Sequence, residues 1–179
     1  MPVPELELYR KQFESVAADA EELTAGLTEA QFNWRPAPGT WSIEECMGHL
    51  VMVGNSQVLH LEQAIEKARS RGITGQPPFE YGMIDRYIVG LTERQRFSAP
   101  PRYQPLHGQP VTGVLPSFLH LQRQLIGLVE QSEGLDLARV KVGTPVSRFV
   151  RMSLGMMFAQ IAAHERRHTE QARRVREKL

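Results

Sequence analysis

The amino-acid sequence predicts an all-α fold with four long helices. Apolar residues recur at helical spacing in four stretches, capping and breaking residues separate these stretches, and no strand-like alternation of apolar and polar residues stands out. The chain has 179 residues, of which 41% are hydrophobic. This length and composition suffice for the core of one domain, which we expect to span residues 1–179.

The first helix is expected over residues 5–27. Its apolar or small residues follow a helical spacing at Leu8, Phe13, Val16, Ala20 and Leu23. The segment that follows, residues 32–41 (FNWRPAPGTW), contains two prolines and a glycine, which end the helix.

The second helix has a sharp predicted start. Ser42 followed by Glu45 matches a capping box, in which hydroxyl and carboxylate each accept from a free backbone amide at the helix start. An inward apolar stripe then continues the helix to about residue 71, through Ile43, Cys46, Leu50 and Val53.

A long connection rich in glycine and proline is expected over residues 72–113, with a short helix over 83–91. A connection of this length is unusual in a compact domain and often carries function. It is long enough to run back along a helix of about 40 Å, at 1.5 Å per residue. The next helix therefore need not be antiparallel to the second.

The third helix is expected over residues 115–132, with Pro116 in its first turn, where proline is tolerated, and Gly134 as its end. The fourth is expected over residues 153–178. Its basic end suits the helix dipole and is interpreted as a solvated helix end, because glutamates interrupt it, rather than as a nucleic-acid patch.

Bulk properties give no indication of a nucleic-acid or membrane partner. The net charge of +1 indicates no nucleic acid and no membrane surface as partner, and no uncharged stretch approaches a membrane span. The N-terminal residues MPVPELELYRKQF carry charges where a signal peptide needs an apolar core. A single cysteine, Cys46, allows no internal disulfide and favours a reducing, cytoplasmic location. We interpret Cys46 as a small buried residue, with a ligand or redox thiol as the alternative.

Three histidines are the candidate metal ligands. His164 and His168 lie four residues apart, so they share one helix face and continue the apolar stripe of the fourth helix. An unpaired polar group at such a position costs about 1–3 kcal/mol, which a shared metal ion would offset. His49 lies on the inward stripe of the second helix. Three imidazoles suit Zn, Ni or Fe and leave a position for water or substrate. The alternative is a set of hydrogen-bonded core histidines, because spacing alone does not bring His49 to the others.

The remaining histidines are separated from this set by geometry. His60 lies about 16 Å farther along the second helix than His49, at 1.5 Å per residue, and cannot share the ion. His107 and His120 are interpreted as surface residues.

Residues 164–168, HERRH, match the H-E-x-x-H pattern of zinc peptidases. We expect no peptidase, because those enzymes take a third ligand downstream and the strand pattern of their sites is missing. Glu165 lies about 80° from the histidine face, at 100° per residue, and is at best peripheral. Gln160 and Gln171 lie closer to that face. Each is a candidate for holding water or substrate or for orienting a ligand, against the alternative of a polar residue at the core edge.

Three segments of the chain resemble the DinB/YfiT-like superfamily. They are NWRPAPGTWSIEECMGHL at residues 33–50, RQRFSAPPRYQP at 94–105, and FAQIAAHERRHTEQARR at 158–174. The resemblance implies a four-helix bundle with a long crossover between the second and third helices, often dimeric. It also implies a divalent metal held by His49, His164 and His168. Relatives include bacillithiol-using thiol S-transferases, a mycothiol-dependent isomerase, and proteins described only as metal-dependent hydrolases or as DNA-damage-inducible.

The main functional hypothesis is a metal-dependent enzyme of the thiol S-transferase type. The metal would activate a low-molecular-weight thiol for attack on a small-molecule substrate. Candidates for lining the substrate pocket are Trp41, Tyr81, Arg86 and Tyr87. The alternatives are a hydrolase that uses a metal-bound hydroxide, and a stress-induced domain that holds metal or ligand without turnover. A homodimer is expected from the resemblance.

Overall fold

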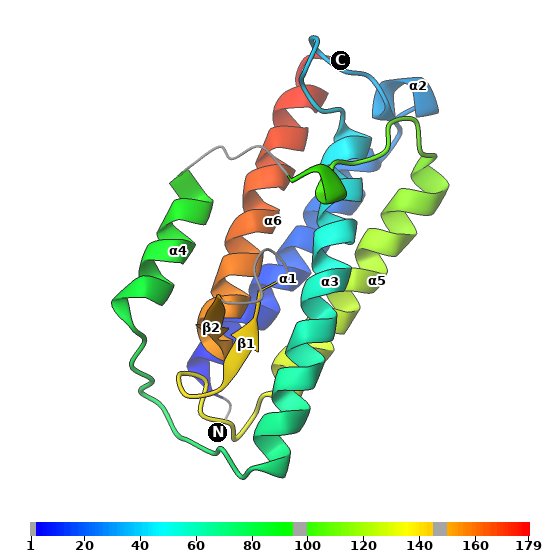
Figure 1. Cartoon of the computed structure of the whole chain (residues 1–179). Helices are drawn as coiled ribbons and strands as arrows, with labels where there is room; N and C mark the ends of the chain where they lie inside the picture. The colour runs from blue at the N-terminus through cyan, green and yellow to red at the C-terminus, as the bar shows by residue number, and fades with distance from the viewer. Residues whose placement is uncertain (1–2, 95–99, 145–149) are drawn as a thin grey trace.

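The computed structural model describes residues 3–94, 100–144 and 150–179. Four long helices form a bundle: α1 (Pro4–Thr24), α3 (Ile43–Ser70), α5 (Val111–Gln131) and α6 (Leu154–Arg176) (Figure 1). The prediction of an all-α fold is confirmed, with the long helices close to their expected positions. No helix of the described ranges combines the length and apolar character needed to cross a membrane.

Each helix of the bundle packs against two neighbours. Both α1 and α3 contact α5 and α6, so α1 and α3 lie on one diagonal of the bundle. Figure 1 shows that α3 and α5 run in the same direction, opposite to α1 and α6. The long crossover makes this possible, because it returns the chain to the end of the bundle where α3 began.

The start of α3 matches the predicted capping box. The backbone amide of Glu45 donates to Ser42 Oγ over 3.1 Å, and the backbone amide of Ser42 donates to Glu45 Oε2 over 2.9 Å. Before it, the short helix α2 (Glu29–Phe32) buries Phe32 against the bundle. The entry of the chain into α3 is therefore fixed on both sides of the cap.

The crossover contains α4 (Met83–Arg94) and a 3₁₀ turn, η1 (Pro101–Tyr103). Helix α4 packs against α6. The buried Asp85 carboxylate anchors it, because Oδ2 accepts from the Ser153 amide over 3.1 Å and from its hydroxyl over 2.5 Å. Ser153 is the N-cap of α6, so Asp85 also satisfies the start of that helix.

The prediction that α5 starts at residue 115 was wrong. The helix begins at Val111 after the N-cap Pro110, and Pro116 therefore lies inside it rather than in its first turn. Proline cannot donate to the carbonyl four residues back, which belongs to Thr112. Because Thr112 is exposed, water can reach that carbonyl, and the helix accommodates the proline.

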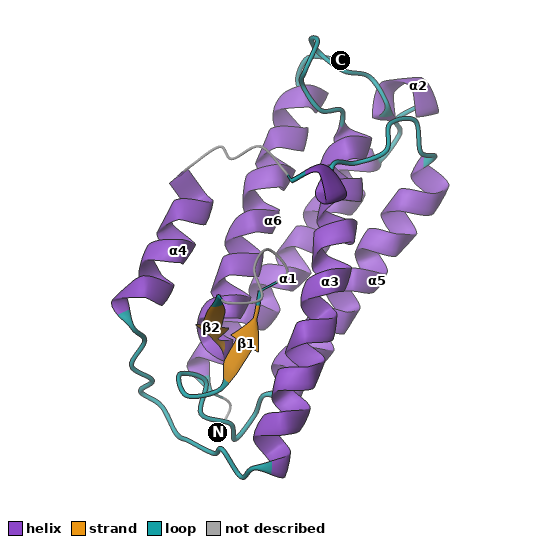
Figure 2. Ribbon diagram, viewed as in Figure 1, coloured by secondary structure: helices purple, strands orange, loops and turns teal. Residues whose placement is uncertain are grey.

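Two short strands were not anticipated. β1 (Lys141–Gly143) and β2 (Arg151–Ser153) pair antiparallel, with Val142 opposite Met152 (Figure 2). Both of these side chains are buried. Three-residue strands are too short to show the alternation that identifies a strand in a sequence.

The half of the bundle nearest the start of α3 has its own apolar cluster. It includes Val16, Phe32, Leu50 and Phe118, together with Cys46, which is 1% exposed. The interpretation of Cys46 as a small buried residue is confirmed. Burial also raises the pKa of its thiol far above the usual value, so it is held as the neutral thiol.

Candidate metal centre

The three candidate histidines meet between α3 and α6. One ligand atom from each of His49, His164 and His168 lies within 4.8 Å of those of the other two. His49 Nε2 and His164 Nε2 are 3.3 Å apart. Two nitrogens on a tetrahedral ion, each bonded at about 2.05 Å, lie about 3.3 Å apart. The closest pair therefore already has the spacing of two ligands on one ion.

The crossover fixes the orientation of the His49 ring. His49 Nδ1 lies 2.7 Å from the backbone carbonyl of Tyr103 in η1, and a carbonyl can only accept, so Nδ1 carries the proton. The lone pair is then on Nε2, which faces His164. A carbonyl that orients a ligand through its other ring nitrogen is a common feature of metal-binding histidines.

Burial keeps all three imidazoles neutral. It lowers the pKa of His49, and lowers those of His164 and His168 to about 3 and about 2; the positive charge of Arg167 acts in the same direction on all three. Neutral imidazole is the form that binds a metal ion. The donor type, spacing and protonation of the cluster therefore fit a divalent ion such as Zn, Ni or Fe.

Trp41 covers one side of the histidine cluster. Its ring centroid lies 4.9 Å from that of His49, and 5.4 Å from that of His168 in a stacked arrangement with an interplanar angle of 22°. Trp41 directly precedes the N-cap Ser42, so its backbone lies next to the capping box that starts α3. Trp41 is the pocket candidate that lies against the histidines.

Arg167 lies at the edge of the cluster. Its Nη2 is 2.9 Å from His168 Nε2 and its Nη1 is 3.4 Å from the carbonyl of Thr92 in α4. Because a guanidinium only donates, His168 Nε2 is the acceptor in this contact. Metal binding through that nitrogen would require the guanidinium to move aside.

The other pocket candidates lie elsewhere. Tyr81 donates to Glu5 over 2.6 Å and packs on Gly155, nine residues before His164 and thus about 13 Å along α6. Arg86 and Tyr87 are exposed on α4, whereas their neighbour Asp85 is buried. The described structure brings none of these three side chains to the histidines.

The polar residues of α6 near the histidines differ in their contacts. Gln160 accepts from Gln57 over 2.9 Å and so joins α6 to α3. Gln171 contacts His168 and slightly opposes the lowering of its pKa. Glu165 points to α5, where it accepts from Gln122 over 2.8 Å; it is buried, and this burial raises its pKa to about 8. It therefore faces the bundle core rather than the histidine cluster.

A small cavity adjoins the cluster on the inner side of His168. Its walls include Cys46, Leu50, Phe118, Thr169 and Ala172, and its room is about that of one water molecule. The inner side of the site is thus mostly apolar and nearly filled.

Sequence reasoning missed the carbonyl of Tyr103 and the guanidinium of Arg167. A backbone carbonyl carries no residue-type signal, so only the fold could identify it. Arg167 lies within the HERRH segment, but nothing in that pattern separates it from Arg166. The buried Glu44, in the first turn of α3, was also missed, because its helix position resembles that of an ordinary first-turn acid.

A four-helix bundle with neutral histidines gathered between two of its helices defines a class of candidate metalloproteins. The model of the DinB superfamily matches residues 12–172, and the chain belongs to that superfamily. It is also 24% identical over 155 residues to the uncharacterized protein YuaE of Bacillus subtilis (strain 168), which covers 86% of this chain and 88% of that protein.

Proposed function

We propose that this protein is a divalent-metal-dependent enzyme of the thiol S-transferase type, with His49, His164 and His168 as ligands. The observation that carries the proposal is the gathering of three neutral imidazoles within 4.8 Å. Three protein ligands leave coordination positions free, as in catalytic rather than structural zinc sites. A bound ion would supply Lewis acidity that lowers the pKa of a thiol at its open position.

The chain's own residues would hold the site ready for this chemistry. The Tyr103 carbonyl keeps the lone pair of His49 on Nε2, and the indole of Trp41 shields one side of the rings from water. In the reaction, the sulfur of the small thiol forms a bond to the electrophilic carbon while the leaving group departs, and the thiol proton passes to solvent. Small-molecule substrates, a homodimer and a cytoplasmic location complete the proposal; light scattering would test the dimer.

To test this proposal, metal-loaded protein is incubated with a low-molecular-weight thiol and a chromogenic aryl halide. In parallel assays it is incubated with simple ester and amide substrates. We expect conjugate formation by the wild type and its loss in His168→Ala, while the exposed His120→Ala variant serves as the matched control. Hydrolysis of esters without conjugation would replace this proposal with a metal-dependent hydrolase. Metal binding with neither reaction would favour a stress-induced binding domain.

A further inference from the structure

The last part of the crossover lies along α3 over three helical turns. This segment, residues 103–109, is called the strap here. The Tyr103 hydroxyl lies 3.5 Å from Ser56 Oγ, its carbonyl accepts from His49 Nδ1 over 2.7 Å, and the Gly108 amide donates to Glu44 Oε2 over 3.3 Å. The strap therefore touches α3 at one end through Tyr103 and at the other through Glu44.

Glu44 is an unusual residue for a first helical turn, because it is 1% exposed. Its carboxylate accepts from the backbone of Gly108 and Gln109, while its Oε1 has no hydrogen-bond partner. Burial raises its pKa to about 7, and the two backbone hydrogen bonds oppose that shift. A buried carboxyl with an unpartnered oxygen is costly, and an apolar residue there would avoid the cost.

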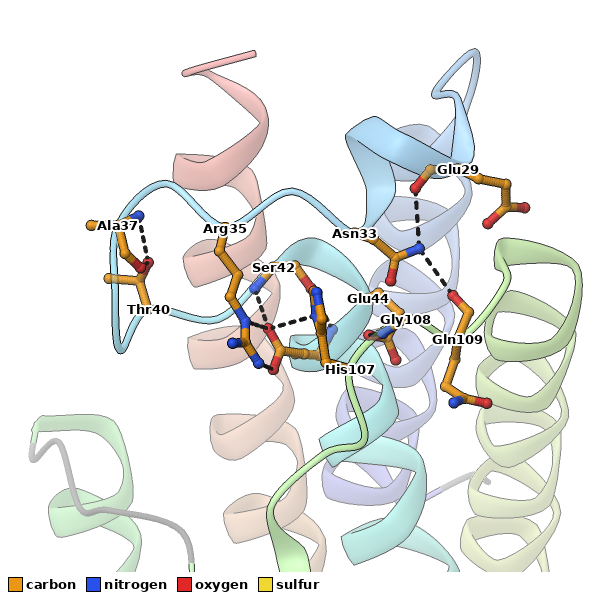
Figure 3. A network of polar contacts seen from close by, with 11 residues as sticks. Glu29, Asn33, Arg35, Ala37, Thr40, Ser42, Glu44, His107, Gly108 and Gln109 are labelled. Atoms are coloured by element: carbon orange, nitrogen blue, oxygen red, sulfur yellow. Dashed lines mark hydrogen bonds and ion pairs between the residues drawn. The ribbon is translucent and has the colours of Figure 1, made fainter.

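The neighbouring acid, Glu45, has a different task. It caps Ser42, forms a bidentate ion pair with Arg35, and lies 3.6 Å from His107 Nδ1 (Figure 3). These contacts mainly hold the segment before α3. The backbone amides of the strap are held by Glu44, as Figure 3 shows for Gly108 beside the Glu44 side chain.

We propose that Glu44 is a positioning residue for the metal centre, which holds the strap on α3 and thereby keeps the Tyr103 carbonyl on His49. The inference rests on the proposed function, since it takes His49 as a ligand. Pro105 stiffens the short path from Tyr103 to Gly108 and packs beside Gly48, so displacement of one end of the strap would be passed to the other. Without the carbonyl, His49 Nδ1 loses its acceptor, and both ring orientation and tautomer become variable.

The test is a titration of wild type, Glu44→Met and Glu44→Gln with Co²⁺, in which the visible absorption of the bound ion is monitored. Methionine fills the same space without an acceptor, whereas the glutamine amide oxygen can still accept from Gly108. We expect Glu44→Met to bind Co²⁺ about 10- to 100-fold more weakly, with altered absorption bands, as for the loss of other ligand-orienting groups. Glu44→Gln should recover most of the affinity, and the exposed Glu66→Ala should match wild type.

Thermal unfolding of the metal-free variants separates positioning from folding. We expect Glu44→Met to be at least as stable as wild type without metal, because it removes a buried carboxyl. Wild-type affinity and absorption in Glu44→Met would overturn the inference and leave the proposed function standing. A wild type that binds no Co²⁺ would instead remove the proposed function, and the two failures are thus distinguishable.

Discussion

At the scale of single residues, the histidine cluster is a costly arrangement for a protein without metal. His49 and His168 are buried and His164 is half-buried, beside an indole and a guanidinium, and removal from water lowers the pKa of all three rings. In water, such rings would gain a proton below their ordinary pKa of 6.5. The folded, metal-free protein must forgo that proton, and this has a measurable consequence.

We predict that acid destabilises the metal-free protein through these histidines. Their folded pKa values lie below the unfolded value of 6.5, so below that pH the unfolded state binds protons that the folded state does not. Stability is then fully present above pH 6.5 and is lost progressively as the pH falls toward about 3. Glu44 acts in the opposite sense between pH 4.5 and about 7, because its folded pKa is raised.

The measurement is the melting temperature of wild type and His168→Leu in the presence of a chelator, from pH 7.5 to 4.5. Because Glu44 is present in both proteins, the difference between them isolates the contribution of His168 to the pH dependence of stability. The wild-type curve should fall more steeply with acid than the variant curve. Parallel curves would show that His168 is not held neutral by the fold.

The residues of the site could be predicted to different extents. Helical spacing alone paired His164 with His168, whereas the inclusion of His49 depended on a family resemblance. The Trp41 lead-in was singled out for the same reason. Tyr81, Arg86 and Tyr87 lie in the crossover, where no spacing rule relates them to the histidines; Tyr81 hydrogen-bonds to Glu5, and Arg86 and Tyr87 are exposed on α4.

At the scale of elements, the contact between α3 and α5 depends on Gly54. A Cβ at this position would lie 2.3 Å from Leu121 Cδ2, and Leu121 is fully buried. Glycine therefore allows the two parallel helices to approach closely, below the turn that carries His49.

We predict that Gly54→Ala destabilises the protein by about 1–3 kcal/mol, as is usual for overpacking in a core. Gly127→Ala in α5 is the matched control, because a Cβ there meets no atom within 4 Å. That change should stabilise by about 0.5–1 kcal/mol through helix propensity. Urea unfolding of both variants provides the measurement; equal effects would show that α3 and α5 are not in close contact at Gly54.

Helix boundaries could be predicted where a side chain marks them and not elsewhere. Ser42 and Glu45 marked the start of α3 to the residue. The start of α5 has no side-chain cap, so no residue type in the sequence marks its first turn. The strands β1 and β2 are held by their pairing and by burial of Val142 and Met152, which only the folded chain provides.

At the scale of the whole molecule, the crossover joins fold and site. It lets α3 and α5 run parallel (Figure 1). It also places α4 on α6 through Asp85 and brings the Tyr103 carbonyl to His49. Its length and composition indicated from the sequence that it could return along the bundle. Which of its atoms would touch the site could not be read from composition.

We propose that His49, His164 and His168 together hold one divalent ion. The direct test is elemental analysis of wild type and of the alanine variant of each histidine, purified without an affinity tag. His60→Ala is the control, because His60 hydrogen-bonds to the Ser56 carbonyl and lies outside the cluster. We predict about one ion per chain in wild type and His60→Ala, as for a single site with three protein ligands, and little in the other three. Full metal content in a folded variant of any of the three would show that the replaced histidine is not a ligand.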